Sequence, residues 1–251
     1  MPEIEARNEG DLATTDEFAS YFVDMVGLVD EEENVSLPLK IADVVRRNLE
    51  VEEVKILGHG SFGAAGLISG TREVLKLTTD VREMKSAAHL IGAELANVVS
   101  YYAAGMIQGV RLRNAEDGKP SPVGASVQGF VDTVGLGSLD MDEALNLIVA
   151  AAKRKHRVFI DEFPKIPEQE VMERLEAASG ALAETLDELG WPYGMIAAGL
   201  RQLMDAGVFA VDVHARNVGR DNQDNQYKIF DIGVSSVRAQ VRTAVLRGRR
   251  P

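Results

Sequence analysis

Three polar side chains late in the chain have the types and the spacing that phosphoryl transfer requires. Asp212 and Asn217 lie five residues apart in a turn after an apolar strand, within the segment AGVFAVDVHARNVG. Asp231 follows a second apolar strand, in YKIFDIG. One carboxylate could orient or deprotonate an acceptor hydroxyl, while an amide oxygen and a second carboxylate could hold Mg²⁺ against phosphate groups. Each of these residues alone is more often a turn residue or a helix cap, so only the three together indicate a site for phosphoryl transfer.

A glycine-rich stretch, GHGSFG at residues 58–63, could lie over phosphate groups. Glycines have no side chains, so their backbone N–H groups can approach phosphate oxygens closely. A dinucleotide-binding fold would need a crossover helix directly after the glycines, but the eleven positions from Gly63 to Val74 are interrupted by Gly66 and Gly70. The spacing therefore favours a β-hairpin, whose tip is either a phosphate-binding loop or an ordinary glycine turn.

Lys76 lies within the apolar strand sequence VLKL, which follows the glycine stretch. Alternation along a strand turns its side chain away from the face used by Leu75 and Leu77. Such a lysine can pair with nucleotide phosphates if a carboxylate holds it, and Glu83, at the start of the next predicted helix, is the best candidate. Glu94, near the end of that helix, is the alternative, and an exposed surface lysine is the plainest interpretation.

Hydrophobic periodicity predicts the elements that must position these side chains. A helix with Thr15 as its N-cap should bury Phe18, Tyr21, Phe22, Met25 and Val26. Further helices are predicted at 38–49, 81–96, 140–154, 167–189 and 192–206, strands at 54–57, 65–68, 74–77, 98–106, 125–131, 208–213 and 227–230, a loop at 113–124 and disorder at 1–14. A strand-rich part thus precedes a helix-rich part, with the change near residues 132–138, and a cleft between two such lobes would be a natural ligand site.

Taken in order, these motifs resemble those of the protein-kinase-like superfamily over roughly residues 54–237. GHGSFG resembles the glycine-rich loop, VLKL the strand with the phosphate-pairing lysine, ANVVSYY the start of the fourth strand, VQGFVD the hinge, AVDVHARN the catalytic loop and FDIG the D-F-G turn. The resemblance implies an α+β fold of two lobes. These would be a β-rich N-lobe (51–134) and a reduced, mostly helical C-lobe (135–251) with a basic tail, preceded by an acidic helical extension (1–50).

The resemblance also implies a role for each matched residue, with ATP and Mg²⁺ as cofactors. Asp212 would be the catalytic base, and Asn217 and Asp231 would hold the metal. Lys76 would pair with the phosphates while Glu83 holds it. The nucleotide would contact the glycine loop, the lysine and the hinge, at Gly58, Gly60, Ser61, Phe62, Gly63, Lys76, Gln128 (as gatekeeper), Gly129, Phe130 and Val131.

The chain also departs from the family pattern. Ala210 and Val211 replace the histidine and arginine of the catalytic loop, which argues against control by activation-loop phosphorylation. Ile232 replaces the phenylalanine of D-F-G, and Ala65 stands where a valine covers the adenine. His214 stands where protein kinases have a lysine, as in some small-molecule phosphotransferases. Only 18 residues follow FDIG, without an A-P-E motif, so the usual platform for a peptide substrate is missing.

Composition limits the classes of protein to which the chain can belong. Of 251 residues, 45% are hydrophobic and 26% are charged, as in ordinary globular proteins, and there is no cysteine for a disulfide or a thiolate metal site. A net charge of -12 argues against a nucleic-acid partner. The acidic start has no apolar signal segment and no run is long enough to cross a membrane, so we expect a cytoplasmic protein with no membrane partner.

The sequence thus predicts an ATP- and Mg²⁺-dependent phosphotransferase whose acceptor is a hydroxyl group, with a protein Ser/Thr favoured. A small-molecule kinase of the aminoglycoside or choline type is one alternative, supported by His214 and the missing platform; the acidic run at 161–163 could then receive a cationic substrate, although a solvated loop is the plainer role for it. A pseudokinase that acts as a nucleotide-binding interaction module is another, with the acidic N-terminal helices and the basic tail as partner surfaces; the N-terminal part is rich in Asp and Glu, as in DEEEN at 30–34. Nucleotidyl transfer and an unrelated α+β binding protein are remoter options.

Overall fold

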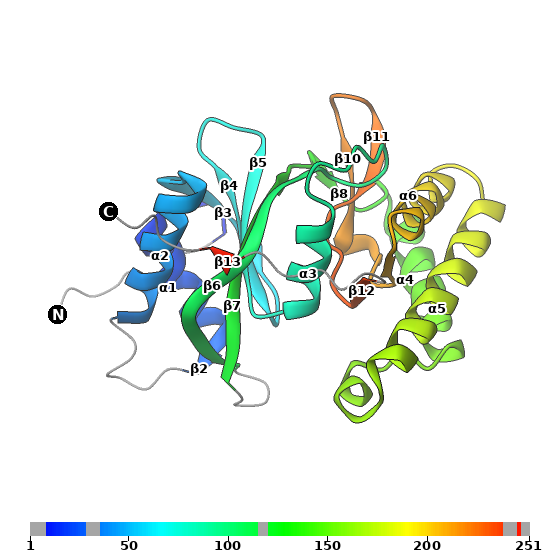
Figure 1. The fold of residues 1–251 in the computed structure, drawn as a ribbon. Helices are drawn as coiled ribbons and strands as arrows, with labels where there is room; N and C mark the ends of the chain where they lie inside the picture. The colour runs from blue at the N-terminus through cyan, green and yellow to red at the C-terminus, as the bar shows by residue number, and fades with distance from the viewer. Residues whose placement is uncertain (1–8, 29–35, 115–119, 238–244, 247–251) are drawn as a thin grey trace. The chain divides into compact units, whose positions relative to one another are not determined.

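The computed structural model describes residues 9–28, 36–114, 120–237 and 245–246, and the chain has the predicted α+β class (Figure 1). Residue contacts divide the chain into two compact units. The first takes in the described parts of 1–84, 102–128 and 243–251, and the second takes in those of 85–101 and 129–242. The acidic stretch at 30–34 and most of the basic tail lie outside the described residues.

The first unit is built on one sheet with the strand order β1-β3-β4-β5-β7-β6-β13, and the short strand β2 also pairs with β6. Its strands are β1 Leu12–Thr14, β2 Gly27–Leu28, β3 Glu53–His59, β4 Gly63–Ile68, β5 Glu73–Thr78, β6 Tyr101–Asn114, β7 Pro120–Gly129 and β13 Val245–Leu246. The glycine stretch joins β3 to β4, and β4 pairs antiparallel with β5 so that Ala65 lies opposite Lys76. The predicted β-hairpin around the glycines is therefore confirmed.

Strands in this unit extend further than the sequence pattern indicates. β6 begins at Tyr101, later than predicted, and runs to Asn114, while β7 already begins at Pro120. The predicted loop at 113–124 is therefore wrong at both ends, and residues 115–119 lie outside the described part. The predicted disorder is likewise wrong at β1, where Leu12 pairs with Lys55 of β3. Long-range strand pairing outweighs the local composition in each case.

Helices α1 (Thr15–Val26) and α2 (Ser36–Leu49) share an apolar core with this sheet. The N-cap of α1 is Thr14 rather than the predicted Thr15, because the Thr14 hydroxyl accepts from the N–H of Glu17 and the Glu17 carboxylate accepts from the N–H of Thr14. Thr15 instead donates its hydroxyl to the Val51 carbonyl at 2.6 Å. Of the side chains predicted to be buried in α1, only Met25 is exposed.

Helix α3 (Val81–His89) begins in the first unit and ends in the second. The Asp80 carboxylate starts it by accepting from the N–H groups of Arg82 at 2.8 Å and Glu83 at 3.2 Å. The predicted extension of this helix to residue 96 is wrong, because the chain turns away and Gly92 adopts a left-handed backbone with φ 78°. Glu94 therefore lies outside any helix.

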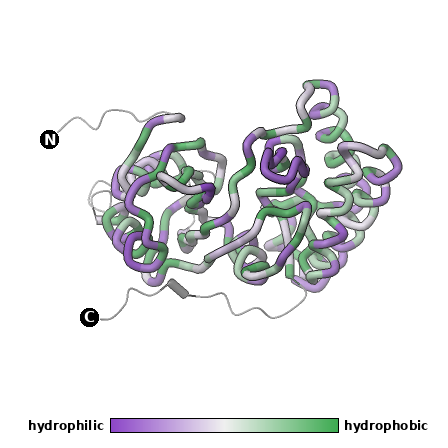
Figure 2. The backbone as a smooth tube through the Cα atoms, turned by 90° about the horizontal axis from the view of Figure 1, so that it is seen from above, coloured by the Kyte–Doolittle hydropathy of each residue, from purple (hydrophilic) through white to green (hydrophobic). Residues whose placement is uncertain are grey.

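The second unit contains α4 (Leu139–Lys155), α5 (Glu168–Glu188) and α6 (Tyr193–Asp205), whose ends each differ from the predicted ones by one residue. Figure 2 shows hydrophobic and hydrophilic residues alternating along these helices, as expected for helices that bury one face. Two small sheets accompany them: β11 (Gln226–Ile229) with β10 (Val218–Asp221) and β8 (Thr133–Val134), and β12 (Ser235–Val237) with β9 (Val208–Ala210).

An apolar core in this unit joins α5 to the segment that precedes Asp212. Val171 and Leu175 of α5 belong to the same buried cluster as Phe209 and Val211. This packing fixes β9 and Val211, and Asp212 follows Val211 directly. None of the helices formed by the described residues is long and apolar enough to cross a membrane.

Candidate functional site

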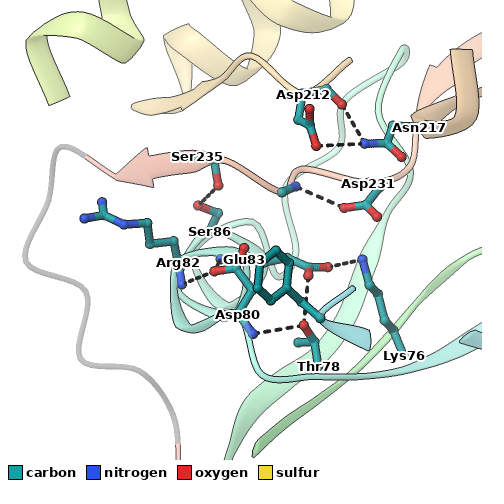
Figure 3. Close-up of polar contacts among 12 residues, drawn as sticks. Lys76, Thr78, Asp80, Arg82, Glu83, Ser86, Asp212, Asn217, Asp231 and Ser235 are labelled. Carbon is teal, nitrogen blue, oxygen red and sulfur yellow. Dashed lines mark hydrogen bonds and ion pairs between the residues drawn. The ribbon is translucent and has the colours of Figure 1, made fainter. Parts of the chain in front are cut away.

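Lys76 and Glu83, which the sequence predicts to be partners, form an ion pair in the first unit (Figure 3). The Lys76 Nζ lies 2.5 Å from Oε1 of Glu83, and the two side chains are only 12% and 4% exposed. The Thr78 hydroxyl donates to the other oxygen of Glu83 at 3.3 Å. Because Asp80 caps α3, Glu83 lies in its first turn, and both of its oxygens are held.

Stability alone is a poor explanation for a pair this deeply buried. Removing two charges from water costs several kcal/mol for each ion, and a well-packed apolar pair of similar volume is often equally stable or more so. A fixed ammonium group is well suited to contact an anion such as phosphate. The Lys76–Glu83 pair therefore fits a binding role better than a packing role.

The glycine loop is closed by a hydrogen bond from the N–H of Gly60 to the carbonyl of Gly63 at 2.8 Å. The fold itself requires two of the glycines: Gly58 has a φ of 146°, and a Cβ on Gly63 would lie 2.6 Å from the Leu77 carbonyl. Gly60 has no such requirement, since a Cβ there would meet nothing within 4 Å and its φ is not left-handed. Open space beside this backbone suits a ligand that approaches it closely.

A carboxylate and an aromatic pair lie at the start of this loop. A Cβ on Gly58 would lie 2.8 Å from a carboxylate oxygen of Glu9. The Tyr21 ring lies edge-on to His59, with centroids 6.0 Å apart. Burial, and then the charge of Glu9, raises the pKa of the Tyr21 hydroxyl above its ordinary value. Because Glu9 would repel phosphate, a phosphate group would be better placed toward the Gly60–Gly63 end of the loop.

The predicted hinge residues lie at the end of β7 and just after it. The N–H of Gly129 donates to the Ser100 carbonyl at 2.9 Å, so it is already used. Val131 is buried, and its N–H has no hydrogen-bond partner among the residues that the structure describes. Buried N–H groups without a partner are rare, so Val131, rather than Gly129, has a backbone donor left for a ligand. Gln128, the predicted gatekeeper, is buried at the end of β7.

In the second unit, Asp212 and Asn217 lie in the turn between β9 and β10 (Figure 3). The Asn217 amide donates to the Asp212 carbonyl at 2.6 Å and lies 3.4 Å from the Asp212 carboxylate. Its NH₂ group is therefore used, and its oxygen is left as an acceptor. The turn is a short 3₁₀ helix, η2 (Ala215–Asn217), which His214 caps by accepting from the N–H of Arg216 at 3.3 Å.

Asp231 follows β11, and its carboxylate accepts from the N–H of Gly233 at 3.0 Å. A Cβ on Gly233 would lie 3.4 Å from a carboxylate oxygen of Asp231 and 3.7 Å from one of Asp212. Both carboxylates therefore lie beside Gly233. The Asn217 carbonyl accepts from the N–H of Phe230 at 3.0 Å, which ties the two turns together.

Backbone strain occurs directly after this turn. Val234 has a φ of 49°, which is a rare conformation for a β-branched residue. Such a conformation costs about 1–3 kcal/mol and persists only where the surroundings impose it. The Val234 side chain packs in the same buried cluster as Phe209 and Val211, so packing can hold it. Strain of this kind is common beside functional sites.

Two residues of α4 that the sequence analysis did not single out contact the turn that carries Asp212 and Asn217. Lys153 forms an ion pair with one carboxylate oxygen of Asp212, and His214 lies 3.8 Å from the other. The Asn146 amide oxygen accepts from the N–H of Ala215 at 2.9 Å. Positions 146 and 153 are seven residues apart, which is the spacing of one helix face, so polar residues at this spacing were the available signal.

The acidic run at 161–163 is a 3₁₀ helix rather than a solvated loop. It lies in η1 (Ile160–Lys165), where Phe163 is buried and Glu162 pairs with Arg174 at 3.0 Å. One of its two acidic charges is therefore already used. This run is a weak candidate for binding a cationic substrate.

The oxygen atoms of the second unit fit Mg²⁺ delivered with a nucleotide. Among the described residues, no three or more His, Cys, Asp or Glu side chains gather as a metal site. Asp231 offers a carboxylate, and the buried Asn217 offers its amide oxygen. In nucleotide sites Mg²⁺ usually takes one or two carboxylates and completes its shell with phosphate and water oxygens.

No protein-family model matches this chain, and no curated protein matches it. What the chain does is therefore inferred from its own residues.

Proposed function

We propose that the chain is an ATP- and Mg²⁺-dependent phosphotransferase with a reduced protein-kinase-like fold, and that its acceptor is a protein Ser/Thr hydroxyl. The observation that supports this most is the arrangement of Asp212, Asn217 and Asp231, with both carboxylates beside Gly233 and an amide oxygen left for a metal. The buried Lys76–Glu83 pair in the first unit adds support, because the order of the motifs predicts that pairing.

In this proposal each residue has a defined task. Bound ATP supplies the phosphoryl group, and Mg²⁺ neutralises charge on its oxygens. Lys76 pairs with phosphate oxygens while Glu83, which Thr78 holds, keeps it in place, and Asn217 and Asp231 offer oxygens to the metal. Asp212 takes the proton that the acceptor hydroxyl loses as its oxygen bonds to the γ-phosphorus and ADP leaves.

Lys153 acts on the same carboxylate from α4. Its ion pair with Asp212 holds the base in one orientation. A fixed ammonium group there also places positive charge where negative charge develops on the transferred group. Lys153 fills this role although His214 stands at the position where protein kinases have a lysine.

The departures at Ala210 and Val211 have a structural explanation that does not require loss of activity. Both residues are fully buried, and Val211 belongs to the apolar cluster that holds β9 in place. A histidine and an arginine there would be costly to bury without partners. The replacements therefore suit the packing around Asp212 and leave the carboxylate itself in the turn.

The test is label transfer from γ-labelled ATP, with Mg²⁺ and a cell lysate, by the wild type and by Asp231→Asn. We expect labelled lysate proteins only with the wild type. Asp187→Asn is the matched control, because Asp187 is an exposed carboxylate of the same unit that pairs with Arg201, and it should transfer normally. Magnesium-dependent ATP binding without transfer would favour a pseudokinase. The absence of both ATP binding and label transfer would contradict the proposal.

A further inference from the structure

A groove of about 420 Å³ lies in the second unit beside Asp212. It is lined by one face of α4, with Asn146, Val149, Ala150 and Lys153 at helical spacing, and by His214 and Arg216 of the turn that carries Asp212. Lys153 lines the groove and also contacts the Asp212 carboxylate. The groove therefore leads to the group that we propose takes the proton.

The lining of this groove is cationic, although the chain carries a net charge of -12. Lys153 and Arg216 bring positive charge, and Asp212 balances that of Lys153. Arg216 is exposed and forms no ion pair within the part of the chain that the structure describes. Because a protein of this net charge repels anions in general, an unbalanced guanidinium at this place selects for an anion here.

Asn146 adds a hydrogen-bond donor to the groove. Its amide oxygen is used by the N–H of Ala215 at 2.9 Å, so its NH₂ group is the part left for a ligand. Val149 and Ala150 lie between Asn146 and Lys153 and give the lining an apolar strip. An open groove with an apolar strip and donors at its ends suits an extended peptide, whereas small ligands are mostly enclosed.

We propose that this groove binds an acidic side chain of the acceptor, so that the chain phosphorylates Ser or Thr residues that are flanked by Asp or Glu. This inference rests on the proposed function. A carboxylate can accept two parallel N–H bonds from Arg216 and a further bond from the Asn146 amide. The acceptor hydroxyl then lies toward Lys153, at the end of the groove where Asp212 is.

Binding of labelled peptides to the full chain without ATP tests the groove separately from catalysis. Three peptides share a central serine and carry acidic, neutral or basic flanks, and their binding is followed by fluorescence anisotropy. We expect the wild type to bind the acidic peptide at least about tenfold more tightly than the neutral one, and Arg216→Glu to abolish the difference. Arg154→Glu is the matched control, because Arg154 is an exposed arginine of α4 that does not line the groove.

Loss of the acidic preference in Arg216→Glu but not in Arg154→Glu supports the inference. Equal binding of the three peptides by the wild type, or an equal effect of the two charge reversals, overturns it. Transfer of γ-label to the same peptides is measured in parallel and reports on the proposed function. Transfer of the label without any preference for the acidic peptide overturns only the inference about the groove. Binding of the acidic peptide with no transfer to any protein overturns the proposed phosphotransferase function.

Discussion

Lys76 shows how a few neighbours fix one side chain of the candidate site. Strand β5 presents it, Glu83 pairs with it, and Thr78 holds the second oxygen of that carboxylate. Asp80 sets the start of α3 and so the place of Glu83. The ammonium group is only 12% exposed, so its ion pair with Glu83 is screened less by water than that of a surface lysine.

Replacing Glu83 with glutamine should therefore be costly. Glu83→Gln removes the negative charge that faces the buried Lys76 ammonium, and we expect the free energy of unfolding to fall by roughly 3–5 kcal/mol. Urea unfolding at neutral pH measures this. Glu188→Gln, at an exposed position in the last turn of α5, should change it by less than about 0.5 kcal/mol.

The double variant Lys76→Met with Glu83→Gln removes both charges together. It should recover much of the loss, because neither charge of the buried pair then remains. A loss below about 1 kcal/mol in Glu83→Gln would show that the pair is better solvated than its burial indicates.

Gly60 offers a test of ligand approach without a stability cost. Since a Cβ at Gly60 meets nothing within 4 Å, Gly60→Ala should leave the free energy of unfolding unchanged or slightly raised. The added methyl group should lower the affinity for Mg²⁺-ATP by about tenfold, which is about 1.4 kcal/mol. Calorimetric titration measures this. Gly194→Ala, where a Cβ also meets nothing, is the control that should keep full affinity, and equal affinity in both variants would place the nucleotide elsewhere.

At the scale of elements, α4 holds the turn that carries Asp212 and Asn217, because the Asn146 amide oxygen accepts from the N–H of Ala215. Asn146→Ala removes the acceptor for the Ala215 N–H, so the turn should lose its fixed position. Small misplacements of catalytic groups can reduce rates by about a hundredfold, and we expect kcat for an acidic peptide to fall by tenfold to about a hundredfold.

Asn146→Asp keeps the acceptor oxygen but adds a negative charge to the groove. It should preserve most of kcat and raise KM for the acidic peptide, because like charges then meet. Steady-state kinetics on the two variants separates positioning from peptide binding. Unchanged kcat in Asn146→Ala would contradict the positioning role.

The helices of the second unit could be predicted closely, because α4, α5 and α6 each bury an apolar stripe that the sequence displays. The ends of β6, β7 and α3 could not be predicted in this way. The two strands are extended by pairing with distant residues, and α3 ends before a left-handed Gly92. Asp212, Asn217 and Asp231 were predictable because they lie at fixed spacing in two turns. Lys153 was not, since its contact with Asp212 depends on how α4 packs against the turn.

At the scale of the whole molecule, the proposed function requires that Lys76 and Asp231 each contribute to the binding of Mg²⁺-ATP. A ligand that binds only the folded chain stabilises it, by about 2.7 kcal/mol at a concentration of a hundred times Kd. We expect Mg²⁺-ATP to raise the melting temperature of the wild type, and ATP with a chelator to raise it much less. Lys76→Met and Asp231→Asn should each lose most of the rise caused by Mg²⁺-ATP, after correction for their own melting temperatures.

If either variant kept the full rise in melting temperature, this would contradict the proposal that Lys76 and Asp231 bind the same nucleotide. Asp187→Asn, outside the candidate site, should keep it. The comparison needs no acceptor, so it remains informative even where no substrate has been found.

The most direct measurement is label transfer from γ-labelled and α-labelled ATP, run in parallel with the wild type and Asp212→Asn. The wild type should transfer the γ-label, and no α-label, to Ser or Thr of acceptor proteins. Asp212→Asn should still bind Mg²⁺-ATP but lose about a hundredfold or more in rate, because the base that takes the hydroxyl proton is gone. Transfer of the α-label, or undiminished γ-transfer by Asp212→Asn, would contradict phosphoryl transfer through Asp212.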